Sequence, residues 1–192
     1  MNKIDLSQFR NEEFNPGKNF FIRTIWFFVN SFIFQSNLFP FYTLKKYILI
    51  LFGAKIGKNF VIKPSVNIKY PWFLSIGNNV WIGEKVWIDN LTNISIGKNV
   101  CISQGAFLLT GNHNYKSIKF DLIVKGITLE DGVWIGAKSI VCPGVICKQY
   151  SILTLGAVAF NNLEAYGIYK GNPAIKIRNR NIYENIDNYR LL

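Results

Sequence analysis

The stretch that decides the fold is Ile127 to Val158, ITLEDGVWIGAKSIVCPGVICKQYSILTLGAV. From Leu129 it divides into units of six residues, which read LEDGVW, IGAKSI, VCPGVI, CKQYSI and LTLGAV. The first place of each unit is aliphatic except at Cys147, and the fifth place is always Val, Ser or Ala. A period of six fits neither a helix, with ~3.6 residues per turn, nor an open strand, with about 2. It is typical of a parallel β-helix, in which each unit builds one short strand and one turn.

The same period begins at Ile56, well before this stretch. Three groups of three units follow one another, at residues 56–73, 76–93 and 96–113, with two residues between neighbouring groups. Three units make one triangular coil, and the aliphatic first places of successive coils stack into a core that no single coil could bury. Glycine often holds the second place, and we interpret it there as a corner residue with unusual backbone angles. These glycines are Gly57, Gly77, Gly83, Gly97 and Gly136.

The period stops at residues 114–126, NYKSIKFDLIVKG. An insertion in a solenoid leaves from a corner and often carries the binding face, because the stacked core cannot accommodate extra residues. His113, the single histidine of the chain, stands at the start of this segment. The sequence therefore predicts an excursion loop at about residues 114–126, with a histidine at its root.

By composition the chain divides into a polar arm with an aromatic helical segment (residues 1–53), the β-helix (54–165) and a basic tail (166–192). Residues 20–52 hold two helix-like apolar runs with Pro40 between them. Neither run reaches the roughly 20 apolar residues that a membrane-spanning helix needs. The residues before them are polar and mixed in charge, so no signal peptide is expected.

Two interpretations of residues 20–52 remain open, and both can hold. In the first, the helices pack over the end of the solenoid as a terminal cap, which repeat proteins need for solubility. In the second, the segment contacts an anionic membrane peripherally, with Trp26 and the phenylalanines inserted and with Lys45 and Lys46 at the headgroups.

Charge and cysteine usage limit the partners further. The chain has 22 Lys and Arg against 11 Asp and Glu, a net charge of +11, which favours an anionic partner: nucleic acid, a lipid headgroup or a phosphorylated small molecule. No recognised DNA- or RNA-binding motif is present, so we expect no nucleic acid. The odd set of three cysteines has no metal-like spacing, which favours reduced thiols and a cytoplasmic location. One histidine is too few for a zinc enzyme built on this type of fold, so we expect no metal.

The six-residue units, the loop that begins at a histidine, the run GVWIGAKSIVCPGV and the terminal GNPAIKIRNR together resemble the left-handed β-helix, or hexapeptide-repeat, acyltransferases. The likeness covers roughly residues 20–180 and is greatest to sugar O-acetyltransferases of the colanic-acid biosynthesis type. It implies a mainly β, left-handed parallel β-helix with an N-terminal helical segment. It also implies acetyl-CoA as co-substrate, a homotrimer with sites between neighbouring solenoids, and direct transfer to a sugar hydroxyl in surface-polysaccharide assembly. An N-acyltransferase acting on an amine and a non-enzymatic solenoid that binds an anionic partner are the alternatives.

The resemblance implies that His113 is the general base. The acceptor alcohol must lose its proton as it attacks a thioester, and a neutral imidazole can take that proton. The competing route is an acyl-enzyme on a cysteine. Enzymes of the colanic-acid type tend to carry an acid after this histidine, whereas this chain has Asn114, which adds no charge. We assign Asn114 to the substrate site, and a backbone carbonyl would also serve to orient the ring.

By the same resemblance, Asn90 and the neighbouring Asp89 contact the acceptor sugar, although Asn is also a common turn residue. Pantetheine can pair with exposed backbone along a groove, and the matching cofactor positions are Trp134, Gly136, Ala137, Thr154 and Leu155. For the phosphates of CoA the tail offers Lys176 and Arg178, since arginine binds phosphate well. The alternative is a solvated basic tail.

Overall fold

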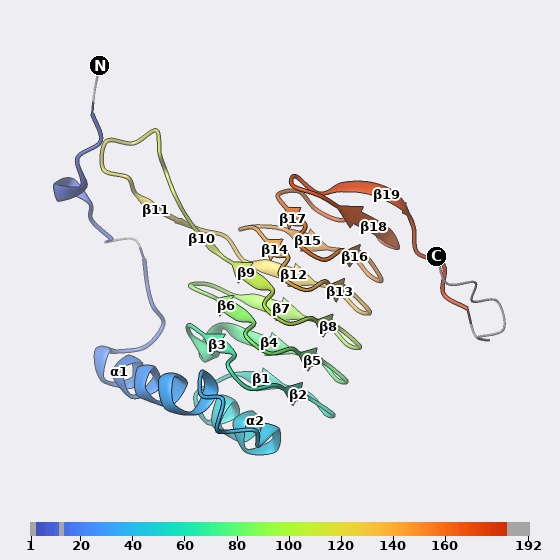
Figure 1. The fold of residues 1–192 in the computed structure, drawn as a ribbon. Coiled ribbons are helices and arrows are strands. Elements are labelled where there is room, and N and C mark those ends of the chain that lie inside the picture. Colours follow the sequence, from blue (N-terminus) through green and yellow to red (C-terminus); the bar gives the residue numbers. More distant parts are fainter. Residues whose placement is uncertain (1–2, 12–13, 184–192) are drawn as a thin grey trace.

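A computed structural model describes residues 3–11 and 14–183, and it shows a parallel β-helix with three walls (Figure 1). The first sheet contains β1 (Lys55–Ile56), β4 (Leu74–Ile76), β7 (Ile94–Ile96), β12 (Ile127–Leu129) and β15 (Ile146–Cys147). The second contains β2 (Val61–Ile62), β5 (Trp81–Ile82), β8 (Cys101–Ile102), β13 (Trp134–Ile135), β16 (Ile152–Leu153) and β18 (Gly167–Lys170). The third contains β3 (Asn67–Ile68), β6 (Trp87–Asp89), β9 (Phe107–Leu109), β14 (Ile140–Val141) and β17 (Val158–Ala159).

The register of the strands confirms the coils expected from the six-residue period. Ile56 pairs with Ile76 and Ile76 with Ile96, so neighbouring coils are 20 residues apart. After the insertion, Leu129 pairs with Cys147, a step of 18. The additional residues lie at one corner, between the third and the first sheet, and we call it the insertion corner. It holds the 3₁₀ turn η3 (Pro71–Phe73), residues 90–93 and, in the third coil, the excursion.

The second-place glycines serve a different purpose from the one expected. None of the five has a positive φ; the left-handed conformation occurs at the fourth place of the units, for example at Asn79 and Lys138. A Cβ on Gly136 would lie 2.5 Å from the backbone nitrogen of Leu155 in the next coil. Glycine is required there because the backbones of stacked coils approach too closely for any side chain.

The outward faces of the three sheets differ in polarity. The first sheet presents mainly polar residues along its ladder, including Ser75, Ser95 and Thr128. The ladders of the other two present apolar rows: Val61, Trp81, Cys101, Trp134 and Ile152 on the second sheet, and Trp87, Phe107, Ile140 and Val158 on the third. Two walls of the prism are therefore apolar on the outside as well as the inside.

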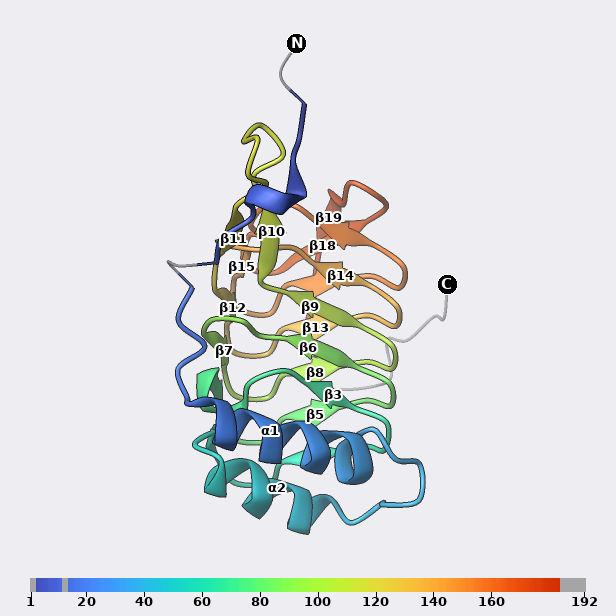
Figure 2. The same ribbon diagram turned by 90° about the vertical axis from the view of Figure 1, so that its left-hand side faces the viewer.

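The N-terminal helical segment lies across the end of the first coil (Figures 1 and 2). It consists of α1 (Phe20–Val29), the π-helical turn η2 (Asn30–Phe34) and α2 (Tyr42–Leu51). Trp26 is 2% exposed, and its indole Nε1 donates to the backbone oxygen of Ile68 at 2.9 Å. None of the helices in residues 3–11 and 14–183 is long and apolar enough to cross a membrane.

Three residues that the membrane interpretation assigned to the lipid face the solenoid, as the cap interpretation requires. Trp26 packs inward, and the side chain of Lys45 is fully buried with its Nζ 5.8 Å from the centre of the Phe34 ring. Burial lowers the pKa of the Lys45 ammonium group. The Lys46 Nζ donates to the backbone oxygen of Gly57. The polar residues Asn30 and Lys45 are on the buried side while several phenylalanines are exposed, so the polarity of the sequence does not indicate which side is buried.

Two segments complete the chain at the opposite end and along the side. β19 (Ile175–Asn179) pairs antiparallel with β18, while tail residues 184–192 lie outside the described part. The arm before α1 follows the insertion corner. Its short 3₁₀ turn η1 (Leu6–Gln8) lies near the excursion, and the indole of Trp72 donates to the backbone oxygen of Pro16 at 2.7 Å.

Candidate active site

The excursion is a β-hairpin that projects from the insertion corner (Figures 1 and 2). β10 (Gly111–His113) pairs antiparallel with β11 (Leu122–Val124), so pairing begins before residue 114, where the loop was expected to start. At its base, the backbone N–H of Lys125 donates to the oxygen of Thr110 at 2.9 Å. A paired hairpin with a tied base gives side chains near its root a defined orientation.

His113 lies at the end of β10 with its ring partly exposed. Its Nδ1 is 2.9 Å from the backbone oxygen of Phe120. A carbonyl oxygen only accepts, so Nδ1 carries the proton in this bond, and in the neutral ring Nε2 keeps its lone pair. The ring also stacks on Phe120, with centroids 4.4 Å apart and planes at 7°, and it contacts Phe9 of the arm at 5.9 Å. A backbone carbonyl therefore orients the imidazole.

Phe120 holds an unusual backbone conformation that belongs to this arrangement. Its φ is +53°, in the left-handed region that bulky side chains rarely adopt. The same residue supplies both the carbonyl and the stacking ring that fix His113. Asn114, next to the histidine, uses its Oδ1 to accept from the N–H of Lys116 at 3.2 Å.

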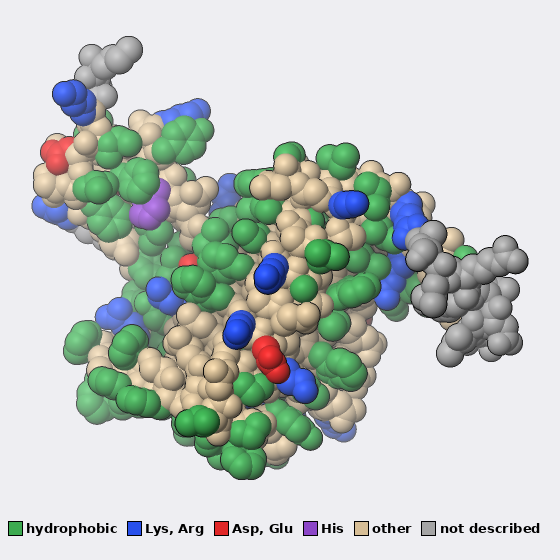
Figure 3. All heavy atoms as spheres, in the orientation of Figure 1, with side chains coloured by type: hydrophobic (Ala, Val, Ile, Leu, Met, Phe, Trp, Pro, Cys, Tyr) green, Lys and Arg blue, Asp and Glu red, His purple; other side chains and the backbone are tan. Residues whose placement is uncertain are grey.

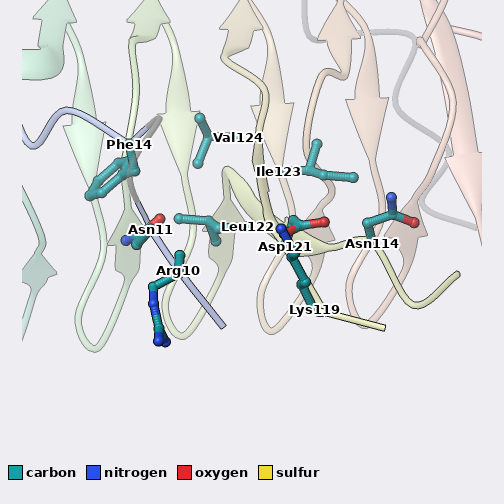
Figure 4. A pocket seen from close by; sticks show the side chains of 9 residues that line it. All are labelled: Arg10, Asn11, Phe14, Asn114, Lys119, Asp121, Leu122, Ile123 and Val124. Atoms are coloured by element: carbon teal, nitrogen blue, oxygen red, sulfur yellow. The ribbon is translucent and has the colours of Figure 1, made fainter. Parts of the chain in front are cut away.

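A groove of about 640 Å³ lies between the arm and the hairpin (Figure 4). The arm contributes Arg10, Asn11 and Phe14, and the hairpin contributes Asn114, Lys119, Asp121, Leu122, Ile123 and Val124. His113 does not line the groove itself, but the next residue, Asn114, does, and Phe9, whose ring centroid is 5.9 Å from that of His113, directly precedes the lining residue Arg10. Its lining mixes cations, a carboxylate, amides and apolar side chains, a combination suited to a polar organic ligand.

The polar groups of this groove are partly fixed by the chain itself. The Arg10 Nη1 donates to the backbone oxygens of Ser7 and Phe9, and the Asp121 carboxylate accepts from the Ser117 hydroxyl at 2.6 Å. Sequence reasoning missed Arg10, Lys119 and Asp121. They lie in segments without the six-residue period, so no sequence signal placed the arm beside the hairpin.

The structure places Asn90 and Asp89 beneath the root of the hairpin. Asn90 is fully buried, and its amide both accepts from the N–H of Tyr70 at 3.0 Å and donates to the Tyr70 oxygen at 2.5 Å. The Asp89 backbone oxygen accepts from the Thr110 hydroxyl at 2.8 Å. Burial raises the pKa of the Asp89 carboxyl, and Lys69, 3.8 Å away, opposes this. These contacts hold the insertion corner together, and the contact of Asn90 with an acceptor stays a prediction.

The expected cofactor residues are brought together, but at a different corner from His113. Gly136, Ala137, Thr154 and Leu155 stack in successive coils between the second and third sheets, and Trp134 stands just before them on the second sheet. The Trp134 indole donates to the Ser103 hydroxyl at 2.9 Å. The close approach at Gly136 serves coil stacking, so its smallness alone does not indicate a ligand.

The two tail cations lie on β19, which extends the same second sheet. The Lys176 Nζ is 2.7 Å from the Glu164 carboxylate, and this hydrogen bond raises the pKa of Lys176 and lowers that of Glu164. Both groups are exposed, so the pair is a weak interaction. Arg178 is exposed on the same strand. Their contact with phosphate stays a prediction.

Metal binding and cysteine nucleophiles are the other chemical possibilities. Within residues 3–11 and 14–183, no group of three His, Cys, Asp or Glu side chains could hold a metal ion. All three cysteines are free, and burial raises the pKa of each thiol, that of Cys147 to about 12. A protonated thiol is a poor nucleophile, which counts against an acyl-enzyme on cysteine.

Comparisons with known proteins place this arrangement among acetyltransferases. No family model matches the chain. It is 36% identical over 176 residues to WcaF of Escherichia coli (strain K12), whose name provisionally assigns it as an acetyltransferase of colanic acid biosynthesis; the match covers 92% of this chain and 97% of WcaF. It is also 27% identical over 131 residues to the galactoside O-acetyltransferase of the same strain. This match covers 67% of this chain and 64% of the galactoside O-acetyltransferase.

A solved structure agrees in fold. The hexapeptide-repeat acetyltransferase VCA0836 of Vibrio cholerae O1 biovar eltor, complexed with acetyl coenzyme A, superimposes with a TM-score of 0.75 at 20% identity. The match covers 89% of this chain and 98% of that one. The left-handed β-helix class expected from the sequence is thereby confirmed.

Proposed function

Because the chain belongs to the hexapeptide-repeat acetyltransferase family, we propose that it transfers an acetyl group from acetyl-CoA to a sugar hydroxyl, with His113 as the general base. The observation that carries the proposal is the imidazole whose Nδ1 is held 2.9 Å from the Phe120 oxygen, which leaves Nε2 as the acceptor of a proton. A positioned base of this kind accelerates a reaction roughly 10²- to 10⁴-fold.

The residues of this chain account for the movement of the proton. The Nε2 atom takes the proton of the acceptor hydroxyl as the hydroxyl oxygen bonds to the acetyl carbon. The carbon–sulfur bond then breaks, and the imidazolium returns the proton to the departing sulfur. The Phe120 carbonyl stabilises the Nδ1–H group in the charged ring, because Asn114 supplies no negative charge for this purpose.

The groove between arm and hairpin is the proposed acceptor site. Its lining includes Asn114, the residue after His113, and its amide and carboxylate groups at Asn11, Asn114 and Asp121 suit the hydroxyls of a sugar. The neighbouring Arg10 and Lys119 would favour an acceptor that carries phosphate or carboxylate. The relative WcaF, by its name, supports an acceptor from surface-polysaccharide biosynthesis.

The assembly proposed is a homotrimer with the active sites between copies. His113 and the cofactor group around Gly136 lie at different corners of the same solenoid, so one chain alone does not bring base and cofactor together. The apolar outward rows of the second and third sheets are surfaces that a neighbouring copy would cover. The CoA phosphates would then meet Lys176 and Arg178 at the end of the second sheet. Three free cysteines favour the cytoplasm as the location.

The test uses the full chain with isotope-labelled acetyl-CoA and a panel of sugar and amino-sugar acceptors, with products identified by mass spectrometry. We expect an O-acetylated sugar, and we expect His113→Ala to lower kcat by roughly 10²- to 10⁴-fold while CoA still raises the Tm. Tyr115→Ala, an exposed change on the same hairpin, is the matched control. Unchanged turnover of His113→Ala would remove the proposed base, and N-acetylated products alone would make the enzyme an N-acyltransferase.

A further inference from the structure

The outer side of the helical end is apolar, which is unusual for the cap of a solenoid. Caps normally turn a polar face outward for solubility. Here α1, η2 and α2 expose large aromatic and aliphatic side chains, and Figure 3 shows hydrophobic groups gathered over this end. The most exposed include Phe20, Phe21, Phe28, Phe32, Phe41 and Leu51, between 52% and 81% exposed. A contiguous apolar surface of this kind indicates a binding partner.

The inward side of the same helices fixes this surface. Trp26, Phe34 and Leu49 are buried, and the Asn30 amide donates to the Asn67 side chain at 2.7 Å and accepts from the N–H of Ile68 at 3.2 Å. The helices are therefore bound to the first coil by buried contacts. The outward phenylalanines are held in place by the solenoid, and a partner meets a preformed face.

The charge around this face has one sign. Residues 14–83, which build the arm end, both helices and the first coil, contain eight Lys and Arg and no Asp or Glu. They account for +8 of the net +11, since the other residues hold 14 cations and 11 acids. Lys18, Lys55 and Lys58 are exposed within this region. An apolar face with exposed lysines beside it has the charge complement of an anionic lipid surface.

We propose that the helical end is a docking surface for an anionic membrane, into which the exposed phenylalanines insert while the surrounding lysines contact the headgroups. A second copy of the chain fits less well, because two such ends would bring exposed lysines such as Lys18, Lys55 and Lys58 toward one another. A nucleic acid would leave the aromatic surface uncovered. The membrane is contacted at its surface, consistent with helices of ten residues each.

The test is co-sedimentation of the full chain with vesicles of phosphatidylcholine alone or with 30% phosphatidylglycerol. We expect binding to the anionic vesicles that weakens as salt is raised. The double variant Phe28→Ser/Phe32→Ser should lower the partition coefficient at least tenfold. Phe160→Ser, 57% exposed in the last coils, is the matched control and should bind as the parent does.

A charge variant tests the second half of the proposal. Lys55→Gln/Lys58→Gln should lower binding to anionic vesicles by roughly fivefold per lysine and leave binding to neutral vesicles unchanged. Lys148→Gln, exposed at the far end, should have no effect. Light scattering and circular dichroism of each variant report its assembly and folding.

Two outcomes would overturn the proposal: a parent chain that stays in solution with every vesicle, or a phenylalanine variant that loses self-association and keeps its vesicle binding. In the second case the face joins copies of the chain. Acetyl transfer to a soluble acceptor is measured separately and should be retained in these variants. A failure of catalysis with vesicle binding intact would therefore count against the enzymatic proposal alone.

Discussion

The walls of the solenoid repeat from coil to coil, whereas its insertion corner differs from one coil to the next. On the walls, each residue is set by its neighbours one coil above and below, as in the stack Ile82, Ile102, Ile135. At the insertion corner, coils differ in length, and the extra residues form η3, the Asn90 turn and the His113 hairpin. The stacked coils that the structure describes therefore accommodate additional residues at the insertion corner only. We therefore expect the proposed base at this corner and the stability of the stack to respond to different substitutions.

The largest effect expected at the corner is on catalysis. His113→Ala should lower kcat by roughly 10²- to 10⁴-fold with little change in the free energy of unfolding, because the ring lies outside the stacked core. Denaturant titration and steady-state kinetics on the same preparation would measure both quantities. A large decrease in the free energy of unfolding would show that the hairpin belongs to the cooperative core. It would contradict the idea that the corner can be changed without affecting the stability of the stack.

The converse is expected on the wall. Ile135 is fully buried, so Ile135→Ala should lower the free energy of unfolding by about 2–5 kcal/mol. Molecules that remain folded should keep most of their kcat, since the Ile135 side chain points into the core, away from the proposed cofactor groove beside Trp134 and Gly136. Chemical denaturation followed by circular dichroism gives the first value, and activity per folded molecule gives the second.

Replacing Asn90 would show whether this residue only stabilises the insertion corner or also contacts the acceptor. Asn90→Ala leaves the Tyr70 N–H and oxygen without their partner, which should cost about 1–3 kcal/mol of stability. If Asn90 only holds the turn, KM for the acceptor should change little once folding is accounted for. A rise in KM at unchanged stability would instead support the acceptor contact implied by the family.

The smallest effects are expected from the cysteines of the walls. Replacing all three by alanine should leave acetyl transfer in place, because the proposed mechanism uses no thiol. In the parent chain at pH 8, a thiol reagent should label Cys147 only after unfolding, since burial raises its pKa to about 12. The unfolded state loses this proton above about pH 9, whereas the folded state keeps it up to about pH 12. The free energy of unfolding should therefore fall as the pH rises from about 9 toward 12.

The sequence predicted the walls well and the corner poorly. Aliphatic residues at every sixth position placed Ile56, Ile76 and Ile96 in register, including the two-residue slips. The second-place glycines were found but explained wrongly, because backbone proximity between coils depends on residues about 20 positions away. The periodicity predicted that the chain leaves the core at His113.

What the sequence left out depends on contacts between distant segments. The Phe120 carbonyl that orients His113 requires the hairpin, while Phe9 reaches the His113 ring and Arg10 reaches the groove from about a hundred residues away. No repeat pattern covers the arm. Likewise, the sequence left open whether Trp26 and Lys45 contact lipid or the solenoid, and the packed structure shows that they are buried against the first coil.

The number of stacked coils also sets the distance between the helical end and the His113 hairpin. Strands in neighbouring coils are ~4.8 Å apart, so the hairpin, which leaves the third coil, stands about 10 Å above the first coil, and a helix layer adds roughly another 10 Å. With the helical end on a bilayer, the root of the hairpin would stand some 20 Å above the headgroups, and the imidazole, at the far end of β10, would lie farther away still (Figure 2), which favours the outer sugars of a lipid-linked chain over those nearest the lipid. Removing one coil, residues 76–95, would lower that working distance by a single strand spacing and shift the choice of sugar toward the membrane.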